Sequence, residues 1–252
     1  MTSPSRLSSL RHAPRWLAAL ALLLLAAALG SCGGGGAGGS VAPSPAPGPS
    51  NPPPATRSFL MGATPFQAGL VNGVVAFPDW KFENLADRDL LSVHADDFWG
   101  VPWSHCSAAG CSGLPPSWVA QWAQLAADAQ ATGKPLYLAL SPLTDRRALA
   151  RRVEADGSLA DYWTAQEDAV GCYLFASDPD AARHKASYIA YVRYLVDLVK
   201  PRFLSPAVEM NMPFTTCPAQ KAAWMAWYAD VHNALKAAYP DLIVFPTFQL
   251  EY

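Results

Sequence analysis

Short apolar runs alternate along the chain with longer segments in which apolar residues recur every three or four positions. The runs predict strands, and the longer spacing predicts helices. The run at residues 136–140 is almost wholly apolar, which is typical of a parallel strand covered on both faces. In all, the pattern predicts five strands, at residues 58–64, 89–98, 136–140, 203–212 and 243–250.

Three helices are predicted between these runs, and their ends carry recognisable signals. Ser117 is expected to cap the first helix, and Gly133 to end it. Asp178 and Pro179 open the second, with the aspartate as cap and the proline at the first helical position, and Pro201 stops it. The expected buried stripes are Trp118, Trp122, Leu125 and Ala129 in the first helix, Tyr188, Val192, Leu195 and Val199 in the second, and Trp224, Tyr228, Val231 and Leu235 in the third.

Strands that alternate with helices predict an α/β fold, with a parallel sheet and right-handed crossovers. Two architectures compete, a doubly wound sheet and a β/α barrel. A doubly wound sheet usually has a glycine-rich phosphate turn after its first strand, and the sequence has none there. A barrel instead places polar side chains where its strands end. We therefore expect a partial TIM-type (β/α) barrel with about five parallel strands and crossover helices.

The most informative polar pair is Glu209 and Asn211, near the end of the run at residues 203–212. Alternate residues of a strand project from the same face, so these two side chains would point the same way. A carboxylate and an amide at the tip of a strand suit the active face of a β/α barrel. Glu209 is thus the candidate acid/base and Asn211 a candidate substrate contact. The alternative is that Glu209 is an inward structural carboxylate held by Asn211.

Two other predicted strands carry polar groups near their ends. His94 and Asp96 lie on one face of the second strand and are candidate contacts for sugar hydroxyls. Gln249, near the end of the last strand, is a third candidate contact. The alternative for His94 is a hydrogen-bonded core histidine. His94 and Asp96 also have metal-ligand chemistry, but a third ligand is lacking, so we predict neither a metal site nor a cofactor.

Trp99 and Trp103 follow the second strand. Each is a candidate for plain packing, but we expect one of the two to stack on the face of a sugar ring. The partner implied by these residues is a carbohydrate. The formal net charge is −2, with both signs interspersed, and this balance gives no surface for nucleic acid.

Residues 1–31 are predicted to be an export signal. Three arginines precede an apolar stretch at residues 16–29, which is too short to span a bilayer comfortably. Residues 29–32, Leu-Gly-Ser-Cys, resemble the bacterial lipobox, which implies cleavage before Cys32 and acylation of its thiol. The alternative is ordinary secretion with Cys32 as a spare thiol. We expect a lipid-anchored protein of the bacterial cell envelope, outside the cytoplasm.

Residues 32–56 are rich in glycine and proline and are predicted to be a tether. Such a segment buries too little apolar surface to offset the entropy lost on ordering. The folded domain is therefore expected at residues 57–252, which is enough for one domain with a core.

Four cysteines follow Cys32. An even number in an oxidising compartment predicts two disulfides. Of the three pairings, we favour Cys106–Cys111, which closes a small loop, together with Cys172–Cys217, which joins two loops. The alternative is a zinc site, but the spacing has no Cys-x-x-Cys pair and no flanking histidine pair.

Taken together, residues 92–103, 135–142, 208–212 and 245–249 resemble the large clan of retaining β/α-barrel glycoside hydrolases, in particular endo-galactanase-like exported bacterial enzymes. The resemblance covers most of the predicted domain in layout. It implies a glycoside-hydrolase-type protein acting on β-linked polysaccharides or oligosaccharides. Only the motif of the fourth strand is specific to the family.

That motif departs from the family pattern. In the family the acid/base is a glutamate directly after an asparagine, whereas here Glu209 precedes Asn211 by two positions. Either Met212 occupies the acid/base position, or Glu209 is the acid in a different register. A retaining mechanism also needs a second carboxylate about 5 Å from the first, which the family places on its seventh strand.

Five predicted strands already use the whole domain, whereas a complete barrel has eight strands in ~250 residues. We expect the chain to be part of a longer hydrolase. The alternative is a short protein that binds glycans without catalysis, or that completes its sheet with a partner chain. A purely structural envelope protein is the third possibility.

Overall fold

The structure, a computed structural model, describes residues 59–62, 70–71, 74–75, 88–95, 99–144, 147–162 and 171–250. All of these residues belong to one compact unit, Thr56–Tyr252. The predicted export signal, Cys32 and the whole of the tether lie outside the described residues, and so does Asp96.

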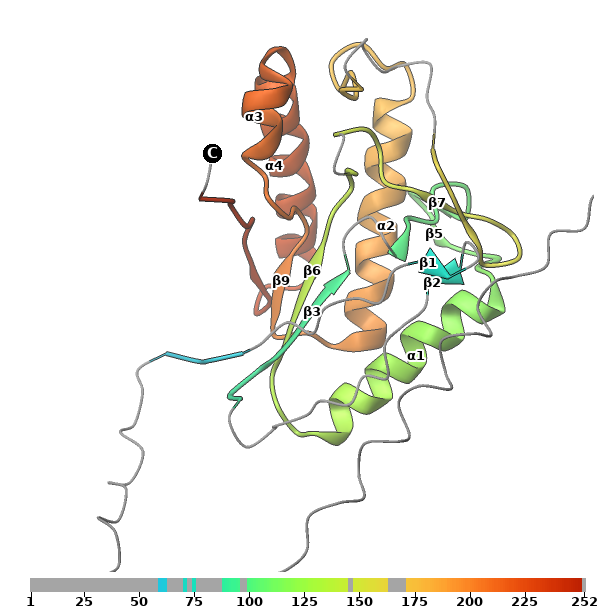
Figure 1. The fold of residues 1–252 in the computed structure, drawn as a ribbon, viewed down its shortest axis with the longest axis vertical. Helices are drawn as coiled ribbons and strands as arrows, with labels where there is room; N and C mark the ends of the chain where they lie inside the picture. Colours follow the sequence, from blue (N-terminus) through green and yellow to red (C-terminus); the bar gives the residue numbers. More distant parts are fainter. Residues whose placement is uncertain are drawn as a thin grey trace, which may run out of the picture. The chain divides into compact units, whose positions relative to one another are not determined.

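A four-stranded parallel sheet lies at the centre of this unit (Figure 1). Its strands are β3 (Leu91–Ala95), β6 (Leu136–Leu140), β9 (Phe203–Ser205) and β10 (Ile243–Val244). They lie side by side in chain order, and every pair is parallel. The predicted α/β fold with a parallel sheet is thus confirmed. The reversal of order that marks a doubly wound sheet does not occur among these four described strands.

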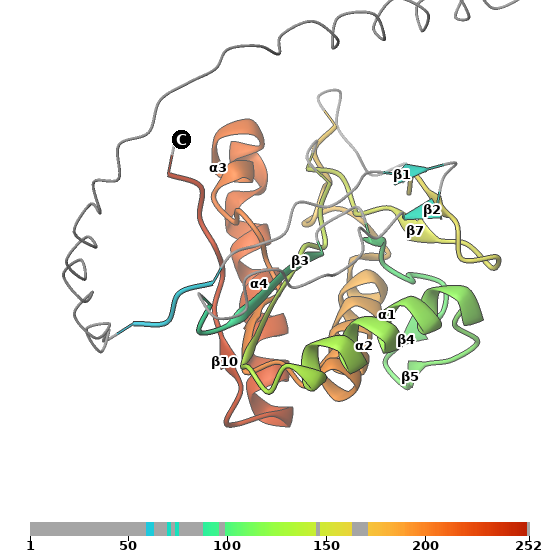
Figure 2. The same ribbon diagram turned by 60° about the horizontal axis from the view of Figure 1, so that its bottom comes forward.

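Three long helices connect the strands: α1 (Pro116–Ala131), α2 (Ala181–Val199) and α4 (Lys221–Ala238). Helix α2 contacts both α1 and α4. In Figure 2, α1 crosses in front of α2, and α4 lies to their left. The helices therefore follow the same order as the strands that they connect. This is the arrangement expected when successive right-handed crossovers lie on the same side of a parallel sheet.

The core lies between the sheet and these helices. Alternate residues of β3 and β6 are buried in it, and every residue of the three predicted helical stripes is buried as well. The core residues of the two strands are Leu91, Val93, Ala95, Leu136, Leu138 and Leu140. The helical periodicity was therefore a correct guide to the faces that pack on the sheet.

The helix ends differ in detail from the prediction. Helix α1 begins one residue before Ser117, whose hydroxyl donates to the Asp156 carbonyl at 3.1 Å instead of capping the helix. Helix α2 begins at Ala181, and Asp178 accepts a hydrogen bond from the Asp180 amide at 2.9 Å. Gly133 follows the end of α1 with φ +66°, as expected for a residue that terminates a helix.

The fourth and fifth strands are shorter than predicted. Strand β9 ends at Ser205 and β10 at Val244, and in each case a proline, Pro206 or Pro246, follows within two residues. Proline has no amide hydrogen to donate to the next rung of the ladder. Beyond Pro206 the chain turns, and helix α3 (Met212–Thr216) begins.

The prediction that strand alternation places Glu209 and Asn211 on one face is consequently wrong. Glu209 has φ +51°, a left-handed conformation that no strand residue adopts, and Asn211 is the N-cap of α3. The predicted strand at residues 58–64 is not seen at residues 59–62, the part that the structure describes.

The remaining described elements are short. Antiparallel pairs are formed by β1 (Leu70–Val71) with β2 (Val74–Val75), β4 (Cys106–Ser107) with β5 (Gly110–Cys111), and β7 (Arg152–Val153) with β8 (Leu159–Ala160). A 3₁₀-helix, η3 (Pro218–Gln220), joins α3 to α4.

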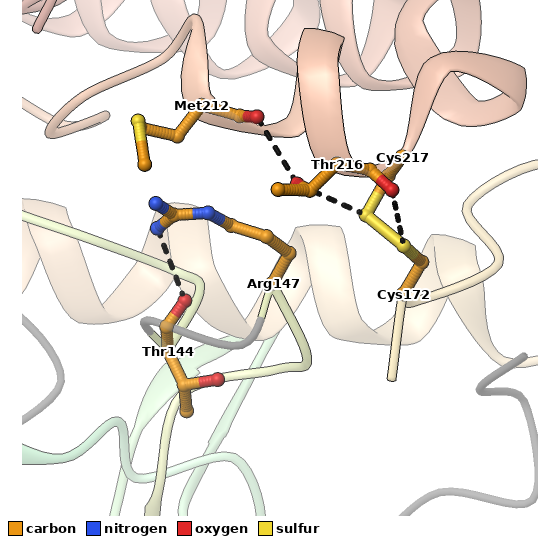
Figure 3. Close-up of a disulfide and its surroundings, with 6 residues drawn as sticks. All are labelled: Thr144, Arg147, Cys172, Met212, Thr216 and Cys217. Carbon is orange, nitrogen blue, oxygen red and sulfur yellow. Dashed lines mark hydrogen bonds between the residues drawn. A yellow bond between two sulfur atoms is a disulfide. The ribbon is translucent and has the colours of Figure 1, made fainter. Parts of the chain in front are cut away.

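Both predicted disulfides are confirmed. Cys106–Cys111 links β4 to β5, with 4.0 Å between the Cα atoms. Cys172–Cys217 joins the segment before α2 to the end of α3, with a Cα separation of 5.8 Å (Figure 3). The second bond therefore ties together two connections that follow different strands of the sheet.

Candidate functional site

The sheet face that turns away from the helices carries polar and aromatic side chains. On β3, Ser92 and His94 alternate with residues of the core and so point to this other face. The strand register aligns Ser92 with Tyr137 of β6, and His94 with Ala139, which is aligned in turn with Ser205 of β9. The predicted polar face of β3 is thus continued by a tyrosine and a serine on the neighbouring strands.

Burial controls the protonation of this face. Burial lowers the pKa of His94 from its ordinary value, and the nearby charge of Glu209 acts in the opposite direction. Burial raises the pKa of Tyr137, against the smaller effect of its hydrogen bond with Ser205. The Tyr137 ring also stacks on Phe245, with 5.6 Å between the ring centroids. At neutral pH the face therefore presents a neutral imidazole and a neutral phenol.

Glu209 lies at the carboxyl end of the sheet, on the turn that follows β9. Two hydrogen bonds to Thr247 hold this turn: the Glu209 amide donates to the threonine hydroxyl at 3.0 Å, and the Met210 amide to its carbonyl at 2.8 Å. The Glu209 side chain is 40% exposed. Its charge is near enough to His94 to act on the pKa of that histidine.

Arg147, which the sequence analysis did not single out, faces Glu209. Its Nη2 atom lies 3.9 Å from Glu209 Oε2, and its side chain is only 11% exposed. Its Nη1 atom donates to the Thr144 carbonyl at 3.4 Å (Figure 3). The only sequence signal was a basic residue in the loop after β6. Because that loop has no periodic pattern, its side-chain direction was not predictable.

Arg147 and Glu209 share an uncommon backbone conformation. Their φ angles are +68° and +51°, a region that few non-glycine residues enter. Lys200, the other non-glycine residue of this kind in the described chain, caps the end of α2. A strained backbone conformation persists only where contacts with the surrounding structure hold it in place, and such conformations concentrate at functional sites. The pairing of two such residues at one edge of the sheet makes this edge the candidate site.

Asn211 and Gln249 come together, but through the main chain. The Asn211 side chain donates to the Gln249 carbonyl and accepts from the Gln249 amide, both at 2.8 Å. This reciprocal pair holds the segment after β10 beside the start of α3. The Asn211 amide is therefore engaged in a structural contact, on the edge where substrate was expected.

The two tryptophans of the predicted sugar platform are fully buried in the core. The Trp103 indole donates to the Ala150 carbonyl at 2.8 Å, and the Trp99 ring packs 4.4 Å from Trp122. Neither ring offers a face to solvent, so the prediction that one of them stacks on a sugar is wrong. They belong instead to the aromatic cluster that α1 and α2 form on the sheet.

Within the described ranges there is no group of three or more residues able to hold a metal ion, and no helix is long and apolar enough to cross a membrane. No family model matches the chain, and no curated protein or solved structure is similar to it. The site is therefore interpreted from its own chemistry.

Proposed function

We propose that the chain contains part of a TIM-type β/α barrel of the retaining glycoside hydrolase kind, acting on a β-linked polysaccharide or oligosaccharide. The observation that supports this most is the sequential order of four parallel strands, with His94, Arg147 and Glu209 at their carboxyl end. β/α barrels form their active sites at that end, from the loops after the strands.

In this proposal Glu209 is the acid/base. It would protonate the leaving oxygen of the glycosidic bond and later remove a proton from the attacking water. His94, kept neutral by burial, would hydrogen-bond a sugar hydroxyl as donor or acceptor. A retaining mechanism also needs a second carboxylate about 5 Å away, and we assign none among the described residues.

The test is release of reducing ends from a panel of β-linked glycans by the mature protein. Removal of an acid/base group typically costs about 10²–10⁴-fold in rate. We therefore expect Glu209→Gln to lower release at least about 100-fold. Glu154→Gln is the matched control, because Glu154 lies in the β7–β8 hairpin and pairs with Arg152. Equal activity of Glu209→Gln and wild type would contradict the assignment.

A non-catalytic glycan-binding lipoprotein is the second candidate. It is favoured by the position of Glu209 on a turn, paired with Arg147, rather than on a strand tip. Glycan binding without release of reducing ends, unchanged in Glu209→Gln, would support it. A protein that binds no glycan on an array would instead have a structural role in the envelope.

We propose a location in the bacterial cell envelope, with a lipid on Cys32. The two disulfides support an oxidising compartment, since such bonds are rare in the cytosol. Metabolic labelling with an alkyne fatty acid in a bacterial host should mark the wild type and leave Cys32→Ala unmarked. Equal labelling of both proteins would exclude acylation at this residue. The partner chain that would complete the sheet stays a prediction from the sequence.

A further inference from the structure

A second polar cluster lies at the start of α2 and takes no part in the proposed carbohydrate site. Tyr162 follows β8, Tyr173 and Asp178 precede α2, and Arg183 and His184 lie in its first turn. The side chains of Asp178 and His184 are each 2% exposed. Tyr162 is half-buried and Arg183 is exposed, so the cluster runs from the interior to the surface.

The buried end of the cluster fixes the histidine ring. Asp178 Oδ2 accepts from His184 Nδ1 at 2.9 Å and from the Tyr173 hydroxyl. Its other oxygen, Oδ1, accepts from the Asp180 amide at 2.9 Å. Both carboxylate oxygens are thus engaged, and the carboxylate holds the imidazole with its proton on Nδ1.

The other ring nitrogen of His184 faces two donors. Arg183 Nη2 and the Tyr162 hydroxyl each lie 3.0 Å from Nε2. A guanidinium can only donate, so Nε2 must present its lone pair. Burial, and next the charge of Arg183, lower the pKa of His184, while Asp178 acts in the opposite direction. At neutral pH the imidazole is therefore neutral, and its Nε2 lone pair lies within hydrogen-bond reach of both the Tyr162 hydroxyl and Arg183 Nη2.

The Tyr162 oxygen also has a cation beside it. Arg183 Nη2 lies 3.4 Å from this oxygen and 3.2 Å from Asp180 Oδ2. The Tyr162 ring is held by stacking on Trp103, with 5.8 Å between the ring centroids. The phenol is thus fixed in place, with a base and a guanidinium at its oxygen.

We infer that Tyr162 is a nucleophilic tyrosine, with His184 as its base, and that its site accepts electrophiles bearing a negative charge. A nucleophile, a base within hydrogen-bond reach and a group that orients the base are the arrangement of activated nucleophiles in enzymes. Asp178 is the positioning residue. Arg183 stabilises the developing phenolate and attracts the anionic group of the electrophile.

Aryl sulfonyl fluorides test this inference directly. The Tyr162 oxygen forms a bond to sulfur, the S–F bond breaks and fluoride leaves, and the phenol proton passes to His184 Nε2. The mature protein is treated at pH 7.5 with benzenesulfonyl fluoride or its 4-carboxy derivative, and labelled tyrosines are mapped by mass spectrometry. Tyr194, a half-buried tyrosine further along α2, is the internal reference.

We expect Tyr162 to be labelled at least about tenfold faster than Tyr194, a low estimate for general-base assistance. Its rate should be nearly flat from pH 7 to 9, because the base is already unprotonated. An unassisted phenol instead reacts about tenfold faster with each pH unit below its pKa of about 10. If Tyr162 in the wild type reacts no faster than Tyr194, or if its rate shows that rising profile, the inference is wrong.

Two variants separate the roles. His184→Gln should bring the Tyr162 rate down to that of Tyr194, while Arg183→Gln should remove the preference for the carboxylated reagent. Circular dichroism establishes that each variant is folded. If His184→Gln unfolds the chain, the pH profile of Tyr162 labelling in the wild type still tests whether a base assists Tyr162. A carboxylated reagent with no advantage in the wild type would overturn the preference for anions.

Discussion

The pair of Arg147 and Glu209 shows how single residues define the candidate site. Each adopts a left-handed backbone conformation, which costs about 1–2 kcal/mol for a residue with a Cβ atom. Hydrogen bonds from the turn to Thr247 offset that cost at Glu209. The sequence predicted Glu209 as the candidate acid/base but placed it on a strand. For Arg147 it showed only a basic residue in a loop, because side chains meet here from loops that are distant in the chain.

Asn211 offers a prediction at the same scale. Its amide makes two hydrogen bonds to the main chain of Gln249, so Asn211→Ala leaves one part-buried donor and one part-buried acceptor without their partners. We expect a loss of about 1–3 kcal/mol in the free energy of unfolding, measured by urea denaturation. Asn233→Ala, on the exposed part of α4, is the matched control. If Asn211→Ala lowers the free energy of unfolding no more than the control does, the Asn211–Gln249 hydrogen bonds do not stabilise the segment after β10.

Two histidines, the half-buried His94 and the buried His184, predict an acid-sensitive fold. Burial lowers the pKa values of His94 and His184 below the ordinary value of 6.5, so the unfolded chain binds protons first as the pH falls. Their contribution to stability is therefore present above about pH 6.5 and is lost as the pH decreases through the folded-state pKa values. Thermal unfolding from pH 8 to 5 should show this fall, with a smaller slope in His184→Gln. An equal slope in both proteins would exclude His184 as a cause.

At the scale of elements, the spacing of apolar residues predicted which faces of the helices and strands are buried in the core. The stripes of α1, α2 and α4 and the three leucines of β6 are all buried, because the helices cover one side of the sheet. The strand ends were wrong where proline interrupts the ladder, at Pro206 and Pro246. These prolines were visible in the sequence. They outweigh the apolar character that suggested longer strands.

The substitution Leu138→Ala tests how much the core between the sheet and the helices contributes to the free energy of unfolding. Leu138 lies at the centre of β6 and is completely buried, so Leu138→Ala leaves a cavity. We expect a loss of about 2–5 kcal/mol in the free energy of unfolding, from urea denaturation. Leu250→Ala is the control, because that side chain is 93% exposed, and it should change stability by less than about 0.5 kcal/mol. Similar losses in both variants would contradict the assigned core.

At the scale of the whole molecule, two disulfides act on loops of very different length. Cys172–Cys217 spans 45 residues and Cys106–Cys111 spans five. A cross-link stabilises mainly by restricting the unfolded chain, and the chain-entropy model gives about 4 kcal/mol for the longer loop and about 2 kcal/mol for the shorter. The even number of cysteines predicted two disulfides, and the favoured one of three possible pairings is the one observed. The position of the longer bond beside Arg147 required the structure.

The two double variants Cys172→Ala/Cys217→Ala and Cys106→Ala/Cys111→Ala test this difference. The first should lower the free energy of unfolding by about 2 kcal/mol more than the second. It should also lower any activity that depends on Glu209. The longer bond links the segment at Cys172, which is hydrogen-bonded to Arg147 through Tyr173, with the helix that follows Glu209. The second variant should leave that activity intact, since its hairpin packs on α2 and not on the turn that carries Glu209. Equal losses of stability would show that loop length does not govern how these bonds stabilise the fold.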